Sequence, residues 1–578
     1  MKRYKYIFLA ALLGFVGCKK MIDLDPQSNI SANNYYSNFS EINTALTGCY
    51  NGMLPTLNEE WQLTELRSDN SIQGVAASTS TVNRDLSDLD MFFPSPSHQG
   101  NYTYWLNNYY NIRNVNFVLN SLNVNYNESA GTIAYDPLTI PVTAAEARSL
   151  AAEASFIRAY HYFNLVRLYG GVFLVHEPIS PEEAKLINRS TVADIYKLII
   201  ADLLNAVNNG ATNRFSAIPA ASLGRANSWS AKALLAKVYL TLNRKTDAAT
   251  ILQDIIANSG YALQANYANI FSTSNEMNSE ILFAIRFKAG GIGLGSALPN
   301  SFAPLNSGAA IILGDGRGLN FPTSELYNSY SAIAAVGNVR SGNTSVTLTA
   351  ANPAITVGMP VTGTQIANGT TVAAISGTTL TLSQAANATL TTAALLIGGD
   401  RRRTVNIGIF TGARFFVQKY ISTITVANDA ENDWPVIRFA DVLLMLAEAE
   451  GNTPNSIANI NQIRTRAGVP ALTTAAINTT ALFETALANE RRWEFAFENQ
   501  RWFDLVRFNT TLTTINAINI MQSHFAVMYP LHYALYPAPR LSLAEMQAFV
   551  INNKLLLPIP QREIDNNTQI VINQNPGY

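Results

Sequence analysis

The sequence predicts a mainly α-helical protein of stacked helix pairs, interrupted by a small β-rich insertion. The segment 144–171 repeats apolar residues at spacings of three and four, which is typical of an amphipathic helix. Two later segments, 225–260 and 434–468, share one plan: an alanine-rich helix, a short turn and a second helix. Helix pairs of this length are typical of tetratricopeptide arrays, in which neighbouring pairs stack into one core. Residues 341–399 instead alternate Thr and Ser with aliphatic residues at period two, which indicates strands.

The composition excludes one broad class of function. The chain has 578 residues, of which 48% are hydrophobic and only 14% are charged, against roughly 25% in an average protein. Its 40 acidic residues nearly cancel its 39 basic residues. A nucleic-acid-binding protein needs a dense basic face to neutralise phosphates, so we expect no nucleic-acid partner. A weakly charged polar surface suits a neutral ligand.

The first 17 residues have the features of a secretory signal. Basic residues open the chain, an apolar run follows over 7–16, and Gly17 provides the small residue that a peptidase needs. Because Cys18 comes directly after it, the segment resembles a bacterial lipoprotein signal, and we expect lipidation at Cys18. The alternative is an ordinary signal cut elsewhere. If Cys18 is lipidated, Cys49 has no disulfide partner, and acyl chains anchor the mature protein to a membrane.

The predicted helices follow in order along the chain. The segment 103–122 repeats apolar residues at helical spacing, and 144–171 carries them on two faces, so we expect that helix to pack on both sides. Gly170 and Gly171 end it. The two helix pairs over 225–260 and 434–468 then complete the predicted helical core.

The β-rich segment is expected to sit on a surface loop of the helical protein, because loop closure entropy rises only slowly with inserted length. We place it at 335–399, between an N-terminal part of the helical domain at 18–334 and a C-terminal part at 400–578. Residues 341–399 contain no Asp, Glu, Lys or Arg. The alternative is a disordered Thr/Ala linker, which the strand-like alternation disfavours.

The stretch "ANERRWEFAFENQRWFDLVRF", residues 488–508, concentrates charged and aromatic side chains. On a helix, Glu490, Glu494 and Glu498 share one stripe. The rings require burial, so the charges beside them are partly desolvated and each needs a partner. We therefore interpret the stretch as a structural clamp, and expect Arg158, which lies in an apolar helix, to pair with one of these carboxylates.

An enzymatic interpretation treats Glu494 and Glu498 as an acid–base pair. Retaining glycosidases place two carboxyl groups about 5–5.5 Å apart, which helix neighbours can reach. However, both side chains would point the same way from one helix, with no sign of a cleft between them. The chain also lacks an HExxH zinc motif. We therefore predict no catalytic residue, no metal and no cofactor.

The segment 88–105 supplies the first candidate ligand-binding residues. Its aromatic residues gather around two prolines, and loop aromatics are expensive to expose unless something covers them. Sugar rings have C–H faces that pack against aromatic planes, while polar groups satisfy their hydroxyls. The candidates are Phe92, Phe93, His98 and Tyr102. Packing in the core is the alternative for these residues.

Two polar pairs complete the predicted binding site. Asp69 and Asn70 could bond sugar hydroxyls, and Asp315 and Arg317 lie among glycines on a predicted loop near the ligand. The alternative is structural, because Asp and Asn commonly cap turns.

Several stretches together resemble the SusD/RagB family of outer-membrane nutrient-binding lipoproteins. In chain order they are "CKKMIDLDPQS", "EASFIRAYHYFNLVRLYGGVFLV", "RANSWSAKALLAKVYL", "WPVIRFADVLLMLAEAE", "INQIRTRAGVPAL", "NERRWEFAFENQRWFDLVRF" and "LLPIPQREIDNNTQIVINQNPGY". The resemblance implies a fold of tetratricopeptide-like helix pairs and a lipid anchor at the outer membrane, facing the cell exterior. It implies a SusC-like TonB-dependent transporter as partner. Family members bind oligosaccharides, sometimes peptides, and are not enzymes. The β-rich insertion departs from the family pattern.

These observations lead to one expectation and two alternatives. We expect a non-catalytic lipoprotein that captures a nutrient oligomer, most simply an oligosaccharide, and delivers it to the transporter. One alternative is a secreted glycoside hydrolase. The other is a tetratricopeptide scaffold that binds only protein.

Overall fold

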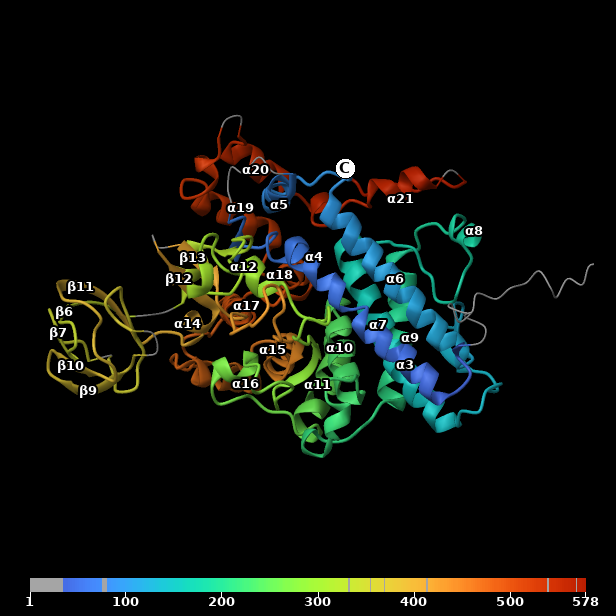
Figure 1. Ribbon diagram of the computed structural model, residues 1–578, viewed down its shortest axis with the longest axis horizontal. Coiled ribbons are helices and arrows are strands. Elements are labelled where there is room, and N and C mark those ends of the chain that lie inside the picture. Colours follow the sequence, from blue (N-terminus) through green and yellow to red (C-terminus); the bar gives the residue numbers. More distant parts are fainter. Residues whose placement is uncertain are drawn as a thin grey trace, which may run out of the picture.

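The computed structural model describes a helical body with one separate β-sheet lobe (Figure 1). The described residues are 35–74, 81–330, 333–353, 355–367, 370–411, 414–537, 540–567 and 569–578. The predicted signal and Cys18 therefore lie outside them. In the described part of the chain, no helix combines the length and the apolar character needed to cross a bilayer.

Stacked helices form the main layer of the body. They are α3 (Phe39–Asn51), α4 (Leu54–Thr64), α6 (Gln99–Ser121), α7 (Ala144–Tyr169), α9 (Val192–Asn209), α10 (Ser228–Thr241), α11 (Lys245–Asn258), α15 (Phe439–Glu450) and α16 (Pro454–Ala467). Helix α7 packs against α6 and α9, α10 packs against α9 and α11, and α15 packs against α11 and α16. This succession confirms the predicted mainly α-helical fold built on helix pairs.

Helix α7 shows why the sequence folds in this way. Thr143 and Glu146 form a capping box that satisfies the first backbone N–H groups of the helix. Its side chains are buried on nearly every side, as the two apolar faces predict. Gly170 ends the helix with φ of 71°, a left-handed conformation that favours glycine.

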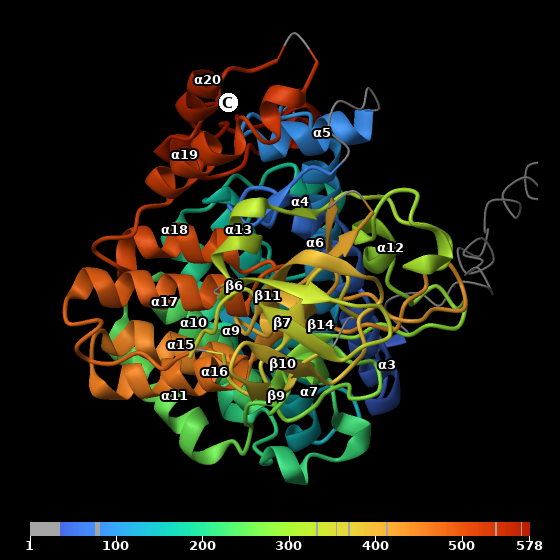
Figure 2. The same cartoon turned by 90° about the vertical axis from the view of Figure 1, so that its left-hand side faces the viewer.

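Ten further α-helices complete the described part of the body. They are α5 (Thr81–Asp90), α8 (Pro181–Ala184), α12 (Leu298–Phe302), α13 (Ser324–Ser329), α14 (Arg402–Asn406), α17 (Thr480–Glu494), α18 (Arg501–Thr511), α19 (Ala517–Met528), α20 (Leu543–Phe549) and α21 (Gln561–Asn566). Figures 1 and 2 both place α19 and α20 beside α5, so the early and late parts of the chain meet at this end of the molecule.

The described part of the chain has four two-stranded sheets, of which two join distant segments and two are hairpins. They pair β1 (Ser71–Ile72) with β5 (Phe321–Pro322), β2 (Val124–Asn127) with β3 (Thr132–Tyr135), β4 (Ile281–Ile285) with β14 (Trp434–Arg438), and β12 (Ile407–Phe410) with β13 (Arg414–Val417). In the first sheet Ser71 lies opposite Pro322. Residues 69–70 are thereby held beside the start of α13.

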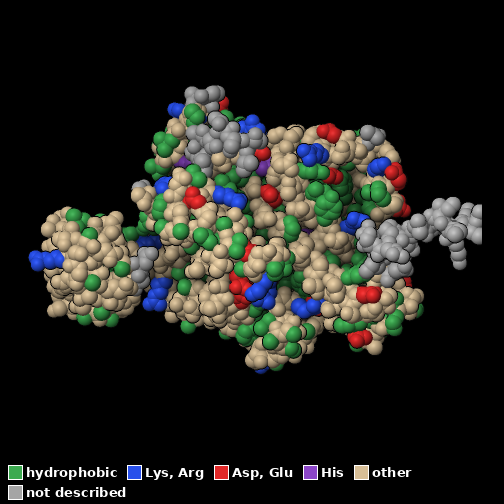
Figure 3. Space-filling model, viewed as in Figure 1, with side chains coloured by type: hydrophobic (Ala, Val, Ile, Leu, Met, Phe, Trp, Pro, Cys, Tyr) green, Lys and Arg blue, Asp and Glu red, His purple; other side chains and the backbone are tan. Residues whose placement is uncertain are grey.

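The lobe is a six-stranded antiparallel sheet with its own apolar core. Its strands, in the order β8-β11-β6-β7-β10-β9, are β6 (Ile333–Val339), β7 (Ser345–Leu348), β8 (Val361–Thr362), β9 (Val372–Ser376), β10 (Thr379–Leu382) and β11 (Leu390–Ile397). Figure 3 shows it as a lobe almost without charged side chains. The segment therefore forms strands and is not the disordered linker considered as an alternative. The boundaries 335 and 399 stay a prediction.

Buried ion pairs join α17 to the strand β14 and its neighbours. Glu494 accepts hydrogen bonds from Arg466 at 2.5 Å, Arg438 at 2.9 Å and Arg402 at 3.0 Å. Glu490 bonds to Arg402, and Glu498 bonds to Arg438. All three carboxylates are almost fully buried. They therefore act as the predicted structural clamp. Glu498 also borders a small pocket of about 30 Å³.

The predicted continuous helix over 488–508 is wrong. Helix α17 ends at Glu494 and α18 begins at Arg501. Between them Phe497 and Asn499 have φ of 65° and 58°. A right-handed helix cannot continue through such residues.

The predicted partner of Arg158 is also wrong. Arg158, on α7, donates from Nε and Nη2 to Asp202 on α9, both at 2.8 Å, and from Nη1 to Asn116 at 2.9 Å. Its side chain does not meet the stripe of Glu490, because α7 packs against α9 at this level of the stack. Arg158 is buried and paired, as expected, but within the N-terminal helix layer.

Candidate functional site

Two of the predicted loop residues are part of the core. The ring of Phe92 is 1% exposed and packs edge-on against Trp502, with ring centroids 5.3 Å apart. His98 caps α6: its Nδ1 accepts from the Asn101 N–H at 3.1 Å, and its Nε2 lies 2.9 Å from the Asp85 carbonyl oxygen. Burial lowers the pKa of His98. For both residues the structure supports core packing instead of the predicted ligand contact.

The other two predicted aromatic residues, Phe93 and Tyr102, are partly exposed and lie near C-terminal residues. Phe93 is 38% exposed and stacks on Phe549 of α20, with ring centroids 5.5 Å apart. Tyr102, on α6, is partly buried, and the Arg562 guanidinium lies 4.8 Å from its ring centroid. These two rings are close to C-terminal residues and are not brought together with the predicted polar residues.

Asp315 and Arg317 lie on the loop that leads to β5. Asp315 has φ of 68°, and its carboxylate accepts from the N–H groups of Gly308 at 2.9 Å and Gly316 at 2.7 Å. These backbone bonds lower its pKa. The carboxylate thus fixes its own loop. Arg317 is exposed and donates to Asn428 Oδ1 at 2.8 Å.

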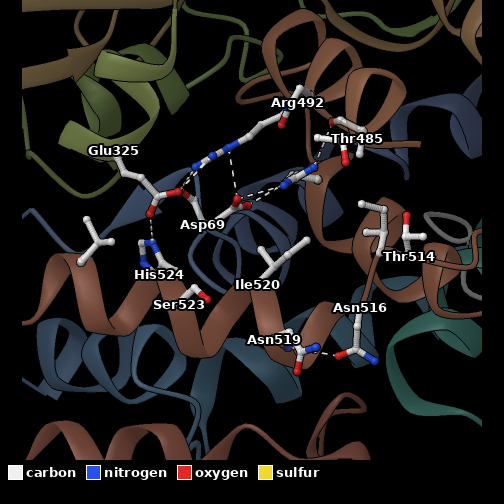
Figure 4. A pocket seen from close by; sticks show the side chains of 15 residues that line it. Asp69, Glu325, Thr485, Arg492, Thr514, Asn516, Asn519, Ile520, Ser523 and His524 are labelled. Carbon is white, nitrogen blue, oxygen red and sulfur yellow. Dashed lines mark hydrogen bonds and ion pairs between the residues drawn. The ribbon is translucent and has the colours of Figure 1, made fainter. Parts of the chain in front are cut away.

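Asp69 and Asn70 are buried beneath a pocket of about 440 Å³. The pocket is lined by Asp69, Glu325 and residues of α17, α18 and α19 and their connections: Thr485, Ala488, Asn489, Arg492, Arg501, Thr514, Ile515, Asn516, Asn519, Ile520, Ser523, His524 and Val527. Figure 4 shows the ion pairs along one side and the side chains of α19 along the other. We call it the Asp69 pocket.

The floor of the Asp69 pocket is a closed set of ion pairs. Arg501 binds Asp69 through two bonds of 2.7 and 2.9 Å, and Arg492 lies 3.2 Å from the same carboxylate. Arg492 also binds Glu325 at 3.0 Å, and Glu325 bonds to His524 Nδ1 at 2.9 Å. Two carboxylates are matched by two guanidinium groups, so the floor presents no net charge from these four groups.

Electrostatics keep the floor ionised. Burial opposes ionisation of Asp69, but Arg492 and Arg501 outweigh it and hold the pKa of that carboxyl well below its usual range. Burial likewise opposes ionisation of Glu325, whereas the bond to His524 and the charge of Arg492 lower its pKa overall. Asn70 supports the same cluster, since its Oδ1 accepts from Arg492 Nε at 2.9 Å. Asp69 and Asn70 are therefore structural supports below the pocket.

The rim of the Asp69 pocket carries unpaired polar side chains. Thr485 and Asn489 project from α17, and Asn519 and Ser523 from α19. Their side chains make no hydrogen bond with any part of the chain that the structure describes. Each has exposed or partly exposed surface. Amide and hydroxyl groups of this kind can donate to and accept from the hydroxyls of a neutral ligand.

These rim residues were not predicted from the sequence, although part of their pattern is visible in it. Asn516, Asn519 and Ser523 follow spacings of three and four, which places them on one helix face. Asn489 lies inside the stretch 488–508, which the charged and aromatic residues around it led us to interpret as purely structural. The pocket has aliphatic side chains such as Ile520 but no Phe, Tyr or Trp among its lining residues.

Comparison with known proteins gives consistent matches over most of the chain. The family model described as "SusD family" matches residues 391–578, and the model described as "Starch-binding associating with outer membrane" matches residues 22–240. "SusD-like protein P25" of Formosa agariphila is 25% identical over 543 residues, covering 88% of this chain and 90% of that protein.

Solved structures match the fold. A structure described as "Laminarin binding SusD-like protein" superposes with a TM-score of 0.64 at 22% identity, covering 94% of this chain and all of that one. The surface glycan-binding protein A from Bacteroides thetaiotaomicron, in complex with laminarihexaose, also gives 0.64, at 18% identity and with 93% and 99% of the two chains covered.

Proposed function

The chain belongs to the SusD/RagB family, and on that premise we propose that it is a cell-surface lipoprotein that binds an oligosaccharide. It delivers this ligand to a SusC-like TonB-dependent transporter in the outer membrane, and Cys18 anchors it there through acyl chains. The chain acts by binding and carries out no reaction of its own.

The observation that carries the proposal is the composition of the Asp69 pocket. Its charged groups bind one another, so a charged ligand would have to compete with ion pairs already formed. Its rim amides and hydroxyls are free to bond a ligand. A neutral oligosaccharide carries many hydroxyls that donate and accept, and a few positioned polar groups fix such a ligand in a cleft. Relatives of the same fold described as binding laminarin and laminarihexaose support the same ligand class.

We expect the double variant Asn489→Ala/Asn519→Ala to weaken oligosaccharide binding. Each hydrogen bond contributes about 0.5–1.5 kcal/mol, so the loss of two amides lowers affinity by about 5- to 150-fold. The measurement is titration calorimetry of the chain from residue 20 onward with a panel that includes laminarihexaose, maltohexaose and a mixed peptide set. Both amides are partly exposed, so the melting temperature should stay unchanged.

Arg317→Ala is the matched control, because this exposed residue lies on the neighbouring loop outside the pocket. If the double variant binds the oligosaccharide as tightly as the wild type while Arg317→Ala binds it more weakly, the ligand contacts the loop of Asp315 instead of the Asp69 pocket. No affinity for any saccharide or peptide would favour the protein-binding scaffold. Release of reducing ends from any polysaccharide would favour the hydrolase.

We expect the full-length chain to sediment with outer membranes and to co-purify with a β-barrel transporter after mild detergent extraction. Acyl chains contribute about 0.8 kcal/mol per buried methylene, so Cys18→Ala should release the protein into the soluble fraction. A wild-type chain found free in solution would contradict the anchor, and a membrane-bound chain without a transporter would contradict delivery.

A further inference from the structure

A second cleft, of about 500 Å³, lies between α6, the segment 173–187 and the C-terminal α21. These elements lie together at one side of the body in Figure 1. Its lining is largely apolar, and Tyr109, Phe173 and Ile179 lie there beside the charged residues Arg113, Lys185 and Glu563. It shares no residue with the Asp69 pocket. We call it the Glu563 cleft.

Three aromatic rings form one wall of the Glu563 cleft. Trp105 lies 5.0 Å from Tyr109 and 5.6 Å from Phe173 between ring centroids, so the rings brace one another. The Tyr109 hydroxyl donates to the Phe173 carbonyl oxygen at 2.9 Å. That polar group is therefore occupied. Trp105 is 1% exposed and supports the wall from behind, so the partly buried rings of Tyr109 and Phe173 are the ring surface offered to a ligand.

The carboxylate of Glu563 is the unmatched group of this cleft. It is partly buried, and it makes no hydrogen bond or ion pair with any residue in the described ranges. Glu563 and Tyr109 line the same cleft. Burial raises the pKa of Glu563, and it also raises the pKa of Tyr109, to which the charges of Tyr162 and Glu563 add. A carboxylate withdrawn from water without a partner is unfavourable unless a ligand supplies one.

The other charged groups of the cleft do not neutralise Glu563. Lys185 is bound by Glu182 at 2.8 Å. The Arg113 guanidinium is exposed and lies 5.4 Å from the ring centroid of Phe117. Glu177, at the exposed rim, likewise forms no ion pair in the described part of the chain. Two carboxylates therefore face the cleft without a fixed cation.

We propose that the Glu563 cleft binds a primary ammonium group carried on an apolar stem. The ammonium pairs with the Glu563 carboxylate, while the stem packs on the aromatic wall and the adjoining positive charge is attracted to the ring faces. A free organic amine and a lysine side chain of a polypeptide share this chemistry. The inference is independent of oligosaccharide binding, because the two sites have separate residues.

The test compares charged and neutral probes of the same shape. Benzylammonium and benzyl alcohol are titrated into the chain from residue 20 onward, followed by ligand-observed NMR, with Nα-acetyl-lysine amide as the polypeptide arm. We expect benzylammonium to bind at least tenfold more tightly than benzyl alcohol. Glu563→Gln should remove this preference and leave benzyl alcohol unaffected. Asp247→Asn, which removes an exposed carboxylate on α11 outside the cleft lining, should retain the preference.

Equal binding of the two benzyl probes to the wild-type chain would overturn the proposal, as would a preference that survives Glu563→Gln. Ala184→Trp serves as a second variant, because the larger ring should fill the cleft and abolish binding of both probes. Stronger binding of the lysine amide than of benzylammonium would identify the source as polypeptide. Laminarihexaose affinity should not change in Glu563→Gln, whatever the outcome for the amines.

Discussion

Replacing Glu494 with leucine is expected to lower the free energy of unfolding by about 3–5 kcal/mol. This carboxylate is fully buried and neutralises three arginines at once, Arg402, Arg438 and Arg466. Leucine would leave the positive charge of the three arginines in the interior with one carboxylate fewer. The acids that still pair with them are Glu280, Asp400, Glu490 and Glu498. The lower free energy of unfolding should appear as a lower denaturation midpoint in guanidinium chloride at pH 7.

The effect of the Glu494 substitution should depend on pH in a defined direction. Burial opposes ionisation of Glu494, but the three arginines outweigh it and lower its pKa. A carboxyl with a lowered folded-state pKa stabilises the fold above its unfolded pKa of about 4.3, and this contribution is lost as the pH falls through the folded value. The difference between the wild type and the variant should therefore narrow below about pH 4.

Glu128→Gln is the control for this experiment. Glu128 pairs with His176 at 2.8 Å, but its side chain is 67% exposed. Surface pairs contribute about 0–1 kcal/mol, so this variant should melt close to the wild type. A loss of under 1 kcal/mol in Glu494→Leu would contradict the assignment of the clamp as an essential part of the core.

Replacing Arg158 with leucine should cost a similar amount, about 3–5 kcal/mol, through a different layer of the molecule. The substitution leaves the fully buried carboxylate of Asp202 without its two bonds from the guanidinium, and frees the Asn116 side chain and the His176 carbonyl oxygen. Burial raises the pKa of Asp202 even with Arg158 present. Without Arg158 the pKa of Asp202 should rise further, so protonation of Asp202 should reduce the loss of stability as the pH falls.

The double variant Arg158→Leu/Asp202→Leu separates the pair from its packing. Removing both charges takes away the penalty of a single buried ion, so the double variant should be more stable than Arg158→Leu alone. Denaturant midpoints of the wild type, both single variants and the double variant give the coupling energy. Additive losses would show that Arg158 and Asp202 act independently, against the geometry.

The spacing of apolar residues in the sequence predicted which helices and strands the fold contains, but not which of them contact one another. The spacing in 144–171 predicted a helix packed on both sides, because periodicity reports burial directly. It could not predict that Arg158 meets Asp202, since burial alone does not say which helix lies opposite. Likewise, charges at helical spacing suggested one helix through 488–508. The turn at Phe497 is held by tertiary packing, which carries no periodic signal.

The candidate site was predicted only in part, for a related reason. The aromatic content of 88–105 led to the prediction that Phe92 and His98 contact a ligand. However, an aromatic ring on a loop can equally pack into the core. Asp69 was predicted to bond a sugar hydroxyl, but its carboxylate is occupied by Arg501. The rim residues Asn489 and Asn519 come from two helices far apart in sequence, and only the packing of α17 beside α19 brings them together.

The β-sheet lobe leaves and rejoins the body at adjacent points. Ile333, the first residue of β6, pairs with Ile397, the last residue of β11. Antiparallel partners have Cα atoms about 4.5–5.5 Å apart, so a tight two-residue turn could close the gap if the lobe were deleted. The lobe can thus be gained, exchanged or lost during evolution without a change in the helical body. For the same reason, a reporter domain could replace it in an engineered variant.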